Sequence, residues 1–351
     1  MKILHFLWAL DNGGAENLAI DLANEQSLEN EVVFFIGNDR IDEAVRARIA
    51  PAVRIVQVGR PANSRNPYWL ARMLVVLHMQ GADVVHAHSS NLAKLGSLIA
   101  APMVLTVHDT HIQLDKSAKK FAVLCCISGA VTRDVTSRYA ALRVKQVNNG
   151  VNTTSIATGI RQRQSTIRAV QISRLVHEKK GQDLLIRALA QVNADPTQPR
   201  LTIDFVGDGP SLQHLAEIAR DVGVSEFCHF LGAQSRDQIY QTLWQYDMLV
   251  QPSRYEGFGL TVAEGMTAGV SVVVSDVEGP MEIINDGEYG YHFKSGDAVS
   301  LANTLNRVMA EMDSPNSALT REAAKKHATS SYDLRLTSKH YCQIYREVAH
   351  A

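Results

Sequence analysis

The glycine-rich segment between Glu256 and Glu264 holds the residues of this sequence best suited to chemistry. It follows an apolar run, Met248–Gln251, that predicts a β-strand, and it passes into a helical pattern. Glycines at a strand-to-helix turn leave backbone amides free to hold phosphate oxygens, and carboxylates accept hydrogen bonds from hydroxyl groups. A nucleotide sugar, with a diphosphate between hydroxyl-bearing rings, supplies the groups that such a segment binds.

Cationic side chains follow a second predicted strand, Ile167–Ser173. Arg174 stands at the end of this strand, and Lys179 and Lys180 lie in the loop that leads into the next helical pattern. Arginine offers a planar fork to phosphate oxygens, while lysine supplies a compact positive charge. These residues predict a diphosphate clamp, with solvated surface charge as the alternative.

Two more glycine turns follow predicted strands. Gly13 and Gly14 come after Ile3–Trp8, and Gly207-Asp208-Gly209-Pro210 comes after Leu201–Val206. Glycine permits positive φ and close approach of the backbone to a phosphate or sugar at a helix N-terminus. A tight strand-to-helix turn is the alternative for Gly13 and Gly14, because the dinucleotide fingerprint Gly-x-Gly-x-x-Gly is absent there.

Three histidines stand at predicted strand ends in the first half of the chain. His86 and His88 flank Ala87, and His108 is followed by Asp109. The closely spaced pair His86 and His88, with a distant His108, suggests zinc. No residue adds a firm third ligand at the spacing of a zinc site, so we expect no metal. A structural imidazole is the alternative for His86. The polar surroundings of His108 predict a hydrogen-bond donor to a substrate hydroxyl.

Length and composition predict a globular protein of about two domains. The 351 residues are 46% hydrophobic and 20% charged. A formal net charge of −1 argues against a nucleic-acid partner, which usually selects a basic face. Residues 1–150 carry 16 lysines and arginines against 13 acidic residues, a small excess that suits an anionic or membrane-bound partner.

The four cysteines show no metal-ligand spacing, and adjacent Cys125 and Cys126 lie in an apolar run. A reducing, cytoplasmic compartment is the simpler interpretation. The N-terminal apolar run lacks a signal-peptide cleavage site, and no apolar stretch approaches the ~20 residues that span a bilayer. We therefore expect membrane contact to be peripheral at most.

Short apolar runs alternate with helical patterns along the chain, which predicts parallel sheets covered by helices. The alternation starts again after a polar stretch near residues 150–166. We therefore expect an α/β protein with Rossmann-like domains at 1–150 and 151–332 that face a cleft. The apolar stripe in 333–351 predicts an amphipathic helix, which we expect to cross back onto the first domain.

Nearly the whole chain carries motifs that, taken in order, resemble the retaining GT-B glycosyltransferases of family four. The match rests on Glu256 and Glu264 around Gly-Phe-Gly-Leu, and on Gly13-Gly14-Ala15-Glu16, His86-Ala87-His88, Val107-His108-Asp109, Asn149-Gly150-Val151, Ser173-Arg174-Leu175, Gly207-Asp208-Gly209-Pro210 and Phe230-Leu231-Gly232. Any one of these motifs is weak evidence, whereas the ordered set is specific.

The resemblance implies a role for each matching residue. Glu256 would contact the donor sugar, Glu264 the ribose, and His108 the transferred sugar. Arg174 with Lys179 or Lys180 would neutralise the departing diphosphate, and two lysines stand where the family usually has one. The amides of the central segment would hold the sugar and diphosphate: Gly257, Phe258, Gly259, Leu260 and Thr261. The Gly13-Gly14 loop would close over the phosphates.

The resulting expectation is a metal-independent enzyme that transfers a hexose with retention. The sequence has no Asp-x-Asp motif, and no cofactor is expected. UDP is the favoured nucleotide, with GDP as the alternative. The expected acceptor is a glycan or lipid-linked saccharide of bacterial surface polysaccharide synthesis, such as lipopolysaccharide, reached at the inner face of the membrane. Lys116, Lys119 and Lys120 add weak support for such a partner.

Two other functions are compatible with the same residues. A nucleotide-sugar epimerase with the GT-B fold would act on the donor without an acceptor. A two-lobed sugar or nucleotide binder would show reversible binding without turnover.

Overall fold

The computed structural model describes residues 1–11, 13–159, 166–197 and 199–350. The chain forms two compact units, one of residues 1–150 with 334–351 and the other of residues 151–333. The chain therefore leaves the first unit at Gly150, at the start of the polar stretch expected to join the domains, and returns to it with the C-terminal helix. Residues 160–165 of that stretch lie outside the described residues.

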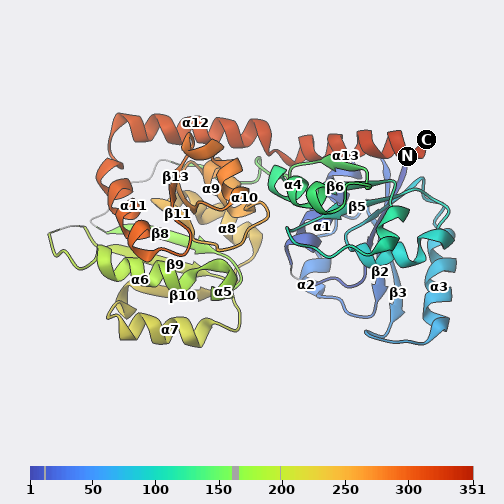
Figure 1. Cartoon of the computed structure of the whole chain (residues 1–351), viewed down its shortest axis with the longest axis horizontal. Helices are drawn as coiled ribbons and strands as arrows, with labels where there is room; N and C mark the ends of the chain where they lie inside the picture. The colour runs from blue at the N-terminus through green and yellow to red at the C-terminus, as the bar shows by residue number, and fades with distance from the viewer. Residues whose placement is uncertain (12, 160–165, 198, 351) are drawn as a thin grey trace. The chain divides into compact units, whose positions relative to one another are not determined.

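In the described residues the first unit contains a seven-stranded parallel sheet (Figure 1), with strand order β3-β2-β1-β4-β5-β6-β7. Its strands are β1 (Lys2–Leu7), β2 (Glu31–Asn38), β3 (Arg54–Arg60), β4 (Val84–Ala87), β5 (Met103–Val107), β6 (Val123–Cys126) and β7 (Val144–Gln146). Its helices are α1 (Gly14–Gln26), α2 (Glu43–Arg46), α3 (Pro67–His78), η1 (Ser90–Leu98), η2 (Lys116–Lys120), α4 (Gly129–Arg138) and α13 (Leu334–Ala349).

The second unit contains a six-stranded parallel sheet among its described residues, with strand order β10-β9-β8-β11-β12-β13. Its strands are β8 (Ile167–Ile172), β9 (Leu201–Val206), β10 (Cys228–Gly232), β11 (Met248–Gln251), β12 (Ser271–Ser275) and β13 (Tyr291–Phe293). Its helices are α5 (His177–Lys180), α6 (Gln182–Val192), α7 (Leu212–Asp221), η3 (Ser225–Phe227), α8 (Arg236–Thr242), η4 (Leu243–Gln245), α9 (Leu260–Ala268), α10 (Glu278–Ile283), η5 (Asn285–Gly287), α11 (Ala298–Glu311) and α12 (Pro315–Ser331).

The expected α/β fold with two Rossmann-like parallel sheets is confirmed. In both sheets the strand order reverses beside the first strand of the unit, between β1 and β4 and between β8 and β11. Loops at the carboxyl ends of such neighbouring strands diverge and leave room for a ligand. A ligand site is therefore expected among the residues that follow β8 and β11.

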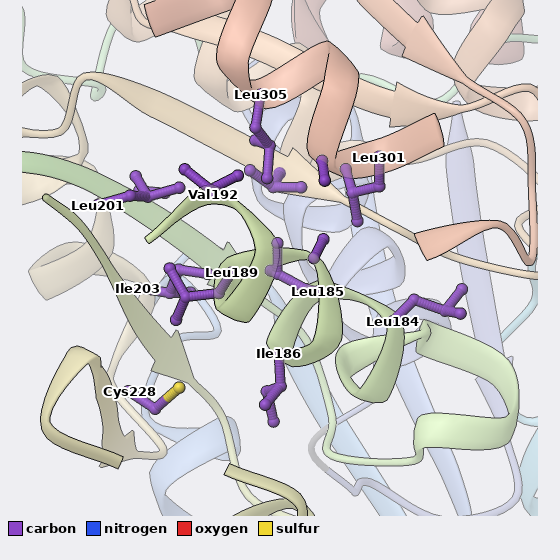
Figure 2. Packing of buried hydrophobic residues seen from close by; sticks show 14 of the residues in the cluster. Leu184, Leu185, Ile186, Leu189, Val192, Leu201, Ile203, Cys228, Leu301 and Leu305 are labelled. Carbon is purple, nitrogen blue, oxygen red and sulfur yellow. The ribbon is translucent and has the colours of Figure 1, made fainter. Parts of the chain in front are cut away.

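Burial of apolar side chains holds each sheet to its helices. In the second unit, α6 places Leu185 and Leu189 in a fully buried cluster that includes Leu201 and Ile203 of β9 and Leu305 of α11 (Figure 2). Each such side chain contributes about 1.5–3 kcal/mol relative to exposure. The sheet is thereby a rigid support for the loops at its edge.

The C-terminal helix α13 supplies part of the first unit's core. Its Tyr341 and Tyr345 are fully buried and cluster with Ile3 of β1 and Val104 of β5. Among the described residues, no helix combines the length and apolarity needed to cross a membrane.

Candidate active site

The loop after β11 is organised around the carboxylate of Glu256. Its Oε2 accepts hydrogen bonds from Gln251 Nε2 at 3.0 Å and from Ser253 Oγ at 3.3 Å. Gln251 is buried at the end of β11, and its Oε1 accepts a bond from Thr261 Oγ1 at 3.1 Å. The strand end therefore fixes both Glu256 and Thr261, two of the residues singled out from the sequence.

Lys180 reaches the same carboxylate from α5. Its Nζ lies 2.6 Å from Glu256 Oε2, and both side chains are mostly buried, with 19% and 15% of their surface exposed. An ammonium group has three N–H donors, so this bond leaves donors for another anion. The fold therefore brings Lys180 into direct contact with Glu256.

Arg254 fastens the Glu256 loop to α5 and α6. Its guanidinium donates two bonds of 2.8 Å to Asp183 and one of 2.6 Å to the His177 carbonyl oxygen. Burial alone would raise the pKa of Asp183, but the bonds and charge of Arg254 lower it. The Arg254 amide also donates to the Lys179 carbonyl oxygen at 2.8 Å. Arg254 thereby sets the spacing between the lysines and Glu256.

The start of α9 presents backbone rather than side chains. Gly259 precedes the helix with φ of 110°, a conformation that suits glycine, and no side chain caps the first turn. Phe258 is buried edge-on against Tyr332, with ring centroids 5.4 Å apart. Phe258 can therefore contact a ligand only through its main chain, and the same holds for Gly257 and Gly259, which have no side chain. Leu260 and Thr261 are the first two residues of α9.

Glu264 is held from the neighbouring helix α8. Tyr240 donates to its Oε1 at 3.0 Å, and Arg236 Nη2 lies 3.5 Å from the same oxygen. Arg236 in turn bonds the Tyr240 hydroxyl at 2.6 Å. Glu264 is only 7% exposed, so its carboxylate is largely removed from water. The bonds to Tyr240 and Arg236 offset the cost of that desolvation. Sequence reasoning identified Glu264 but missed the pair that orients it.

Arg174 and Gly207 stand at the neighbouring strand ends. Arg174 is exposed, and within the described ranges no ion pair or hydrogen bond involves its guanidinium. Gly207 has φ of 142°, and a Cβ there would lie 1.9 Å from the Ser173 carbonyl oxygen. That space is occupied by protein backbone, so packing of two loops by itself accounts for this glycine. The expected close approach of a nucleotide stays a prediction.

The Gly13-Gly14 turn differs from the expectation of positive φ. Gly13 has an extended backbone with φ of −131° and precedes α1 without a side-chain cap, and Gly14 is the first helical residue. A Cβ at Gly13 would lie 2.3 Å from Glu16 Oε2, while the space beside Gly14 is open. Neither position requires glycine by its backbone angles, since Gly13 is extended and Gly14 is helical. Uncapped amides remain at the helix start.

The histidines of the first unit form a connected set. His5 Nδ1 lies 3.1 Å from His88 Nε2, and His88 Nδ1 lies 3.4 Å from His108 Nε2. His5 Nε2 lies 2.7 Å from Gln26 Oε1 at the end of α1. His86, with ring nitrogens 2.6 Å from both Thr106 Oγ1 and Tyr345 Oη, has the structural role weighed for it.

Burial keeps these imidazoles uncharged. It lowers the pKa of His5 and of His108 to about 4, and it lowers the pKa of His86 and His88 well below the usual range. Neighbouring imidazoles add to the effect at His86 and His88, whereas the charge of Asp109 partly opposes it at His108. At neutral pH each ring therefore has one N–H donor and one lone pair.

Ligand atoms of His5, His86 and His88 lie within 4.8 Å of one another, a spacing that a metal ion could bridge. Yet each of their six ring nitrogens already has a hydrogen-bond partner. A metal would have to displace several of these buried bonds, each worth about 1 kcal/mol. The hydrogen-bonded arrangement accounts for the cluster by itself.

Comparison with known proteins assigns the family. Residues 158–327 match the glycosyl transferases of group 1, and residues 12–155 match glycosyltransferase family 4. A glycogen synthase of Mycobacterium tuberculosis is 26% identical over 288 residues, or 75% of this chain and 68% of the relative. The lipopolysaccharide core biosynthesis glycosyltransferase LpsE of Rhizobium meliloti is 27% identical over 343 residues and 94% of both chains.

Solved structures share the fold of this chain. The crystal structure of Anabaena HepE in complex with UDP and glucose superposes with a TM-score of 0.81 over 99% of this chain and 100% of that one, at 23% identity. The family 4 match lies mostly in the first unit and the group 1 match lies in the second, and residues 1–11, 156–157 and 328–351 lie outside both matches. The chain therefore belongs to the group 1 glycosyltransferases with the GT-B fold, and it is a glycosyl-transferring enzyme.

Proposed function

We propose that this enzyme transfers a hexose from a nucleoside diphosphate, UDP in preference to GDP, to a glycan or lipid-linked saccharide, with retention and without a metal ion. The observation that carries the proposal is the grouping at the β8 and β11 strand ends: Lys180 on Glu256, uncapped amides at α9, and Arg174 without a partner in the described part of the chain. Cations and amides suit a diphosphate, and carboxylates suit hydroxyls.

Each residue has a distinct part in the proposed reaction. The bond between the anomeric carbon and the phosphate oxygen breaks, and its electron pair stays on the diphosphate, where Arg174 and Lys180 stabilise the charge. Lys179 adds positive charge nearby. Glu256 orients sugar hydroxyls and Glu264 the ribose. The acceptor hydroxyl attacks from the side of the leaving group and passes its proton to a phosphate oxygen, which preserves the anomeric configuration.

Two relatives support the substrate classes. HepE was crystallised with UDP and glucose, and LpsE acts in lipopolysaccharide core biosynthesis. The first favours a UDP-hexose, and the second favours a bacterial surface glycan as acceptor. We propose that the reaction belongs to surface polysaccharide synthesis and takes place at the cytoplasmic face of the membrane.

Donor dependence is tested with UDP- and GDP-hexoses, a lipopolysaccharide core acceptor and excess EDTA. We expect product from a UDP-hexose at an unchanged rate in EDTA, with the anomeric configuration of the donor by NMR. Inverted product, or activity that EDTA removes and Mg²⁺ restores, would contradict the proposal. Release of a new sugar from donor alone would indicate the epimerase instead.

Helix α3 supports contact with an anionic membrane surface. Tyr68, Val75 and Met79 recur at helical spacing on one face and are 56%, 58% and 77% exposed. Residues 44–82 contain six arginines and no acidic residue, and Arg65 and Arg72 are exposed beside this face. An apolar helix face flanked by arginines is typical of an interfacial helix. The exposed lysines of η2 add charge of the same sign.

We expect the V75D/M79D double variant to lose most binding to phosphatidylglycerol vesicles in a sedimentation assay, since two charges oppose burial of the α3 face. Binding to phosphatidylcholine should be weak for both proteins. L319D is the matched control, because Leu319 is 68% exposed on α12 of the other unit. Equal binding of the double variant and the control would exclude α3 as the contact.

A further inference from the structure

The half-buried His108 is linked by hydrogen bonds to the buried His88 and, through it, to the buried His5. A line of hydrogen bonds runs from Gln26 through His5 and His88 to His108. In a line of neutral imidazoles, each contact needs one donor and one acceptor. The donor pattern at one end therefore fixes the pattern at the other.

Gln26 supplies the fixed end. Its Oε1, an acceptor only, faces His5 Nε2 at 2.7 Å, and its Nε2 donates to Tyr345 Oη at 3.4 Å. His5 must then carry its proton on Nε2 and accept at Nδ1. His88 must donate from Nε2 to His5 and accept at Nδ1, and His108 must donate from Nε2 to His88.

We propose that Gln26 is a positioning residue that holds His108 in the Nε2–H tautomer through His5 and His88, so that His108 Nδ1 is a hydrogen-bond acceptor. Within the described ranges, Nδ1 of the half-buried His108 has no hydrogen-bond partner, so it is the nitrogen left for a ligand. The sequence predicted a donor at His108, and the relay reverses that polarity.

The consequence for catalysis rests on the proposed function. If His108 lies against the transferred sugar, Nδ1 accepts a hydrogen bond from a sugar hydroxyl and cannot donate one. The tautomer also resists change. To reverse it, the proton of each of the three imidazoles would have to move to the other ring nitrogen, and the Gln26 amide would have to rotate at the same time. His108 is thereby prepared for its ligand before the ligand binds.

The surroundings of the relay help to keep it neutral and ordered. His5 and His88 are buried, and no carboxylate among the described residues bonds to either ring. His86 extends the same network, because its ring nitrogens bond Tyr345 Oη and Thr106 Oγ1, and the Thr106 hydroxyl lies 2.8 Å from Tyr341 Oη. Helix α13, which supplies Tyr345, therefore helps to hold the Gln26 amide in its orientation.

Long-range ¹H–¹⁵N correlation NMR on the full chain with ¹⁵N-labelled histidine tests the relay. We expect the Nε2–H pattern for His5, His88 and His108, with signals assigned from single His→Asn variants. The Nδ1–H pattern at any of the three, or unlike patterns among them, overturns the proposal. This readout needs no substrate, so it stands apart from the test of the proposed function.

Variants of Gln26 test its control over His108. In Gln26→Met the anchor is lost, and we expect an Nδ1–H population to appear at His108, whereas Gln26→Glu keeps an acceptor and the wild-type pattern. Gln80→Met is the control, since Gln80 is also a buried glutamine of this unit but contacts Arg54 and the Val76 carbonyl oxygen. Identical His108 spectra in Gln26→Met and wild type overturn the proposal.

Kinetics give a second readout. We expect Gln26→Met to lower kcat about three- to tenfold, the equivalent of one neutral hydrogen bond, with little change in the donor KM. Gln26→Glu should restore most of kcat. A raised KM with unchanged kcat in Gln26→Met contradicts a positioning role. Absence of transfer by the wild type would instead count against the proposed function and leave the NMR test intact.

Discussion

Replacement of Arg174 by alanine is expected to lower kcat/KM about 10²- to 10³-fold while leaving the folded protein as stable as the wild type. The loss corresponds to removal of one donor that stabilises developing negative charge, here on the departing diphosphate. Stability should change by less than about 0.5 kcal/mol, because the exposed guanidinium has no partner within the described residues. Steady-state kinetics and thermal unfolding measure the two effects separately.

Arg220→Ala is the matched control, since Arg220 is an exposed arginine in the last turn of α7 in the same unit. It removes the same charge from the protein at a position away from the β8 strand end. If Arg174→Ala and Arg220→Ala agree within about threefold in kcat/KM, Arg174 does not act on the diphosphate. Arg174→Lys should retain part of the activity, because it keeps the charge but loses the fork.

Lys180→Ala would not separate an effect on activity from an effect on stability. Its ammonium lies on the Glu256 carboxylate, so Lys180→Ala leaves a mostly buried negative charge without its cation. Removing one partner of a buried pair costs stability as well as function. A fall in activity there would mix the loss of a phosphate contact with displacement of Glu256. Arg174 and Lys180 differ in this respect because Lys180 is paired with Glu256, whereas Arg174 is exposed. The sequence alone did not reveal this difference.

The fold was predictable because the apolar runs and helical patterns are local. Parallel strands buried on both faces are short and apolar, and such runs can be recognised one at a time. The three-residue strands β7 and β13 give no such signal, because Val144–Gln146 and Tyr291–Phe293 are too short to show a pattern. Both are edge strands, where burial is one-sided and the signal weakest.

The residues at strand ends were predictable for a different reason. Arg174 and Glu256 are far apart in sequence, yet β8 and β11 are neighbours, so polar residues that follow both strands lie at one edge. Their partners had no such signal. Arg254 finds Asp183 across 71 positions, and Gln26 finds Tyr345 across 319, so neither pair leaves a spacing that can be read along the chain.

The polarity of His108 shows the same limit more sharply. Its polar neighbours predicted a hydrogen-bond donor to a ligand, whereas in the proposed relay Nε2 donates inward to His88 and Nδ1 is left as an acceptor. The nitrogen left for a ligand is determined by Gln26, two imidazoles away. A tautomer is a property of a network, and only the assembled sheet brings β1, β4 and the end of α1 together.

Gly181→Ala is expected to destabilise the second unit by about 2–5 kcal/mol. Gly181 has φ of 68°, and an alanine Cβ there would lie 1.9 Å from the Pro252 carbonyl oxygen. The left-handed conformation alone costs about 1–2 kcal/mol for a residue with a side chain, and overpacking adds about 1–3 kcal/mol. The obstructing atom is backbone of the loop that Arg254 fastens to α6, so it cannot swing aside.

Gly223→Ala separates the two contributions. Gly223 has φ of 74°, close to that of Gly181, but nothing lies within 4 Å of the position that its Cβ would take. We expect this control to lose only the conformational cost of about 1–2 kcal/mol in urea unfolding. Equal stability of the two variants would mean that the α5 loop and the Pro252 loop do not pack at the distance described. Because the same packing brings Lys180 to Glu256, Gly181→Ala should also lower kcat in the folded protein, whereas Gly223→Ala should leave it unchanged.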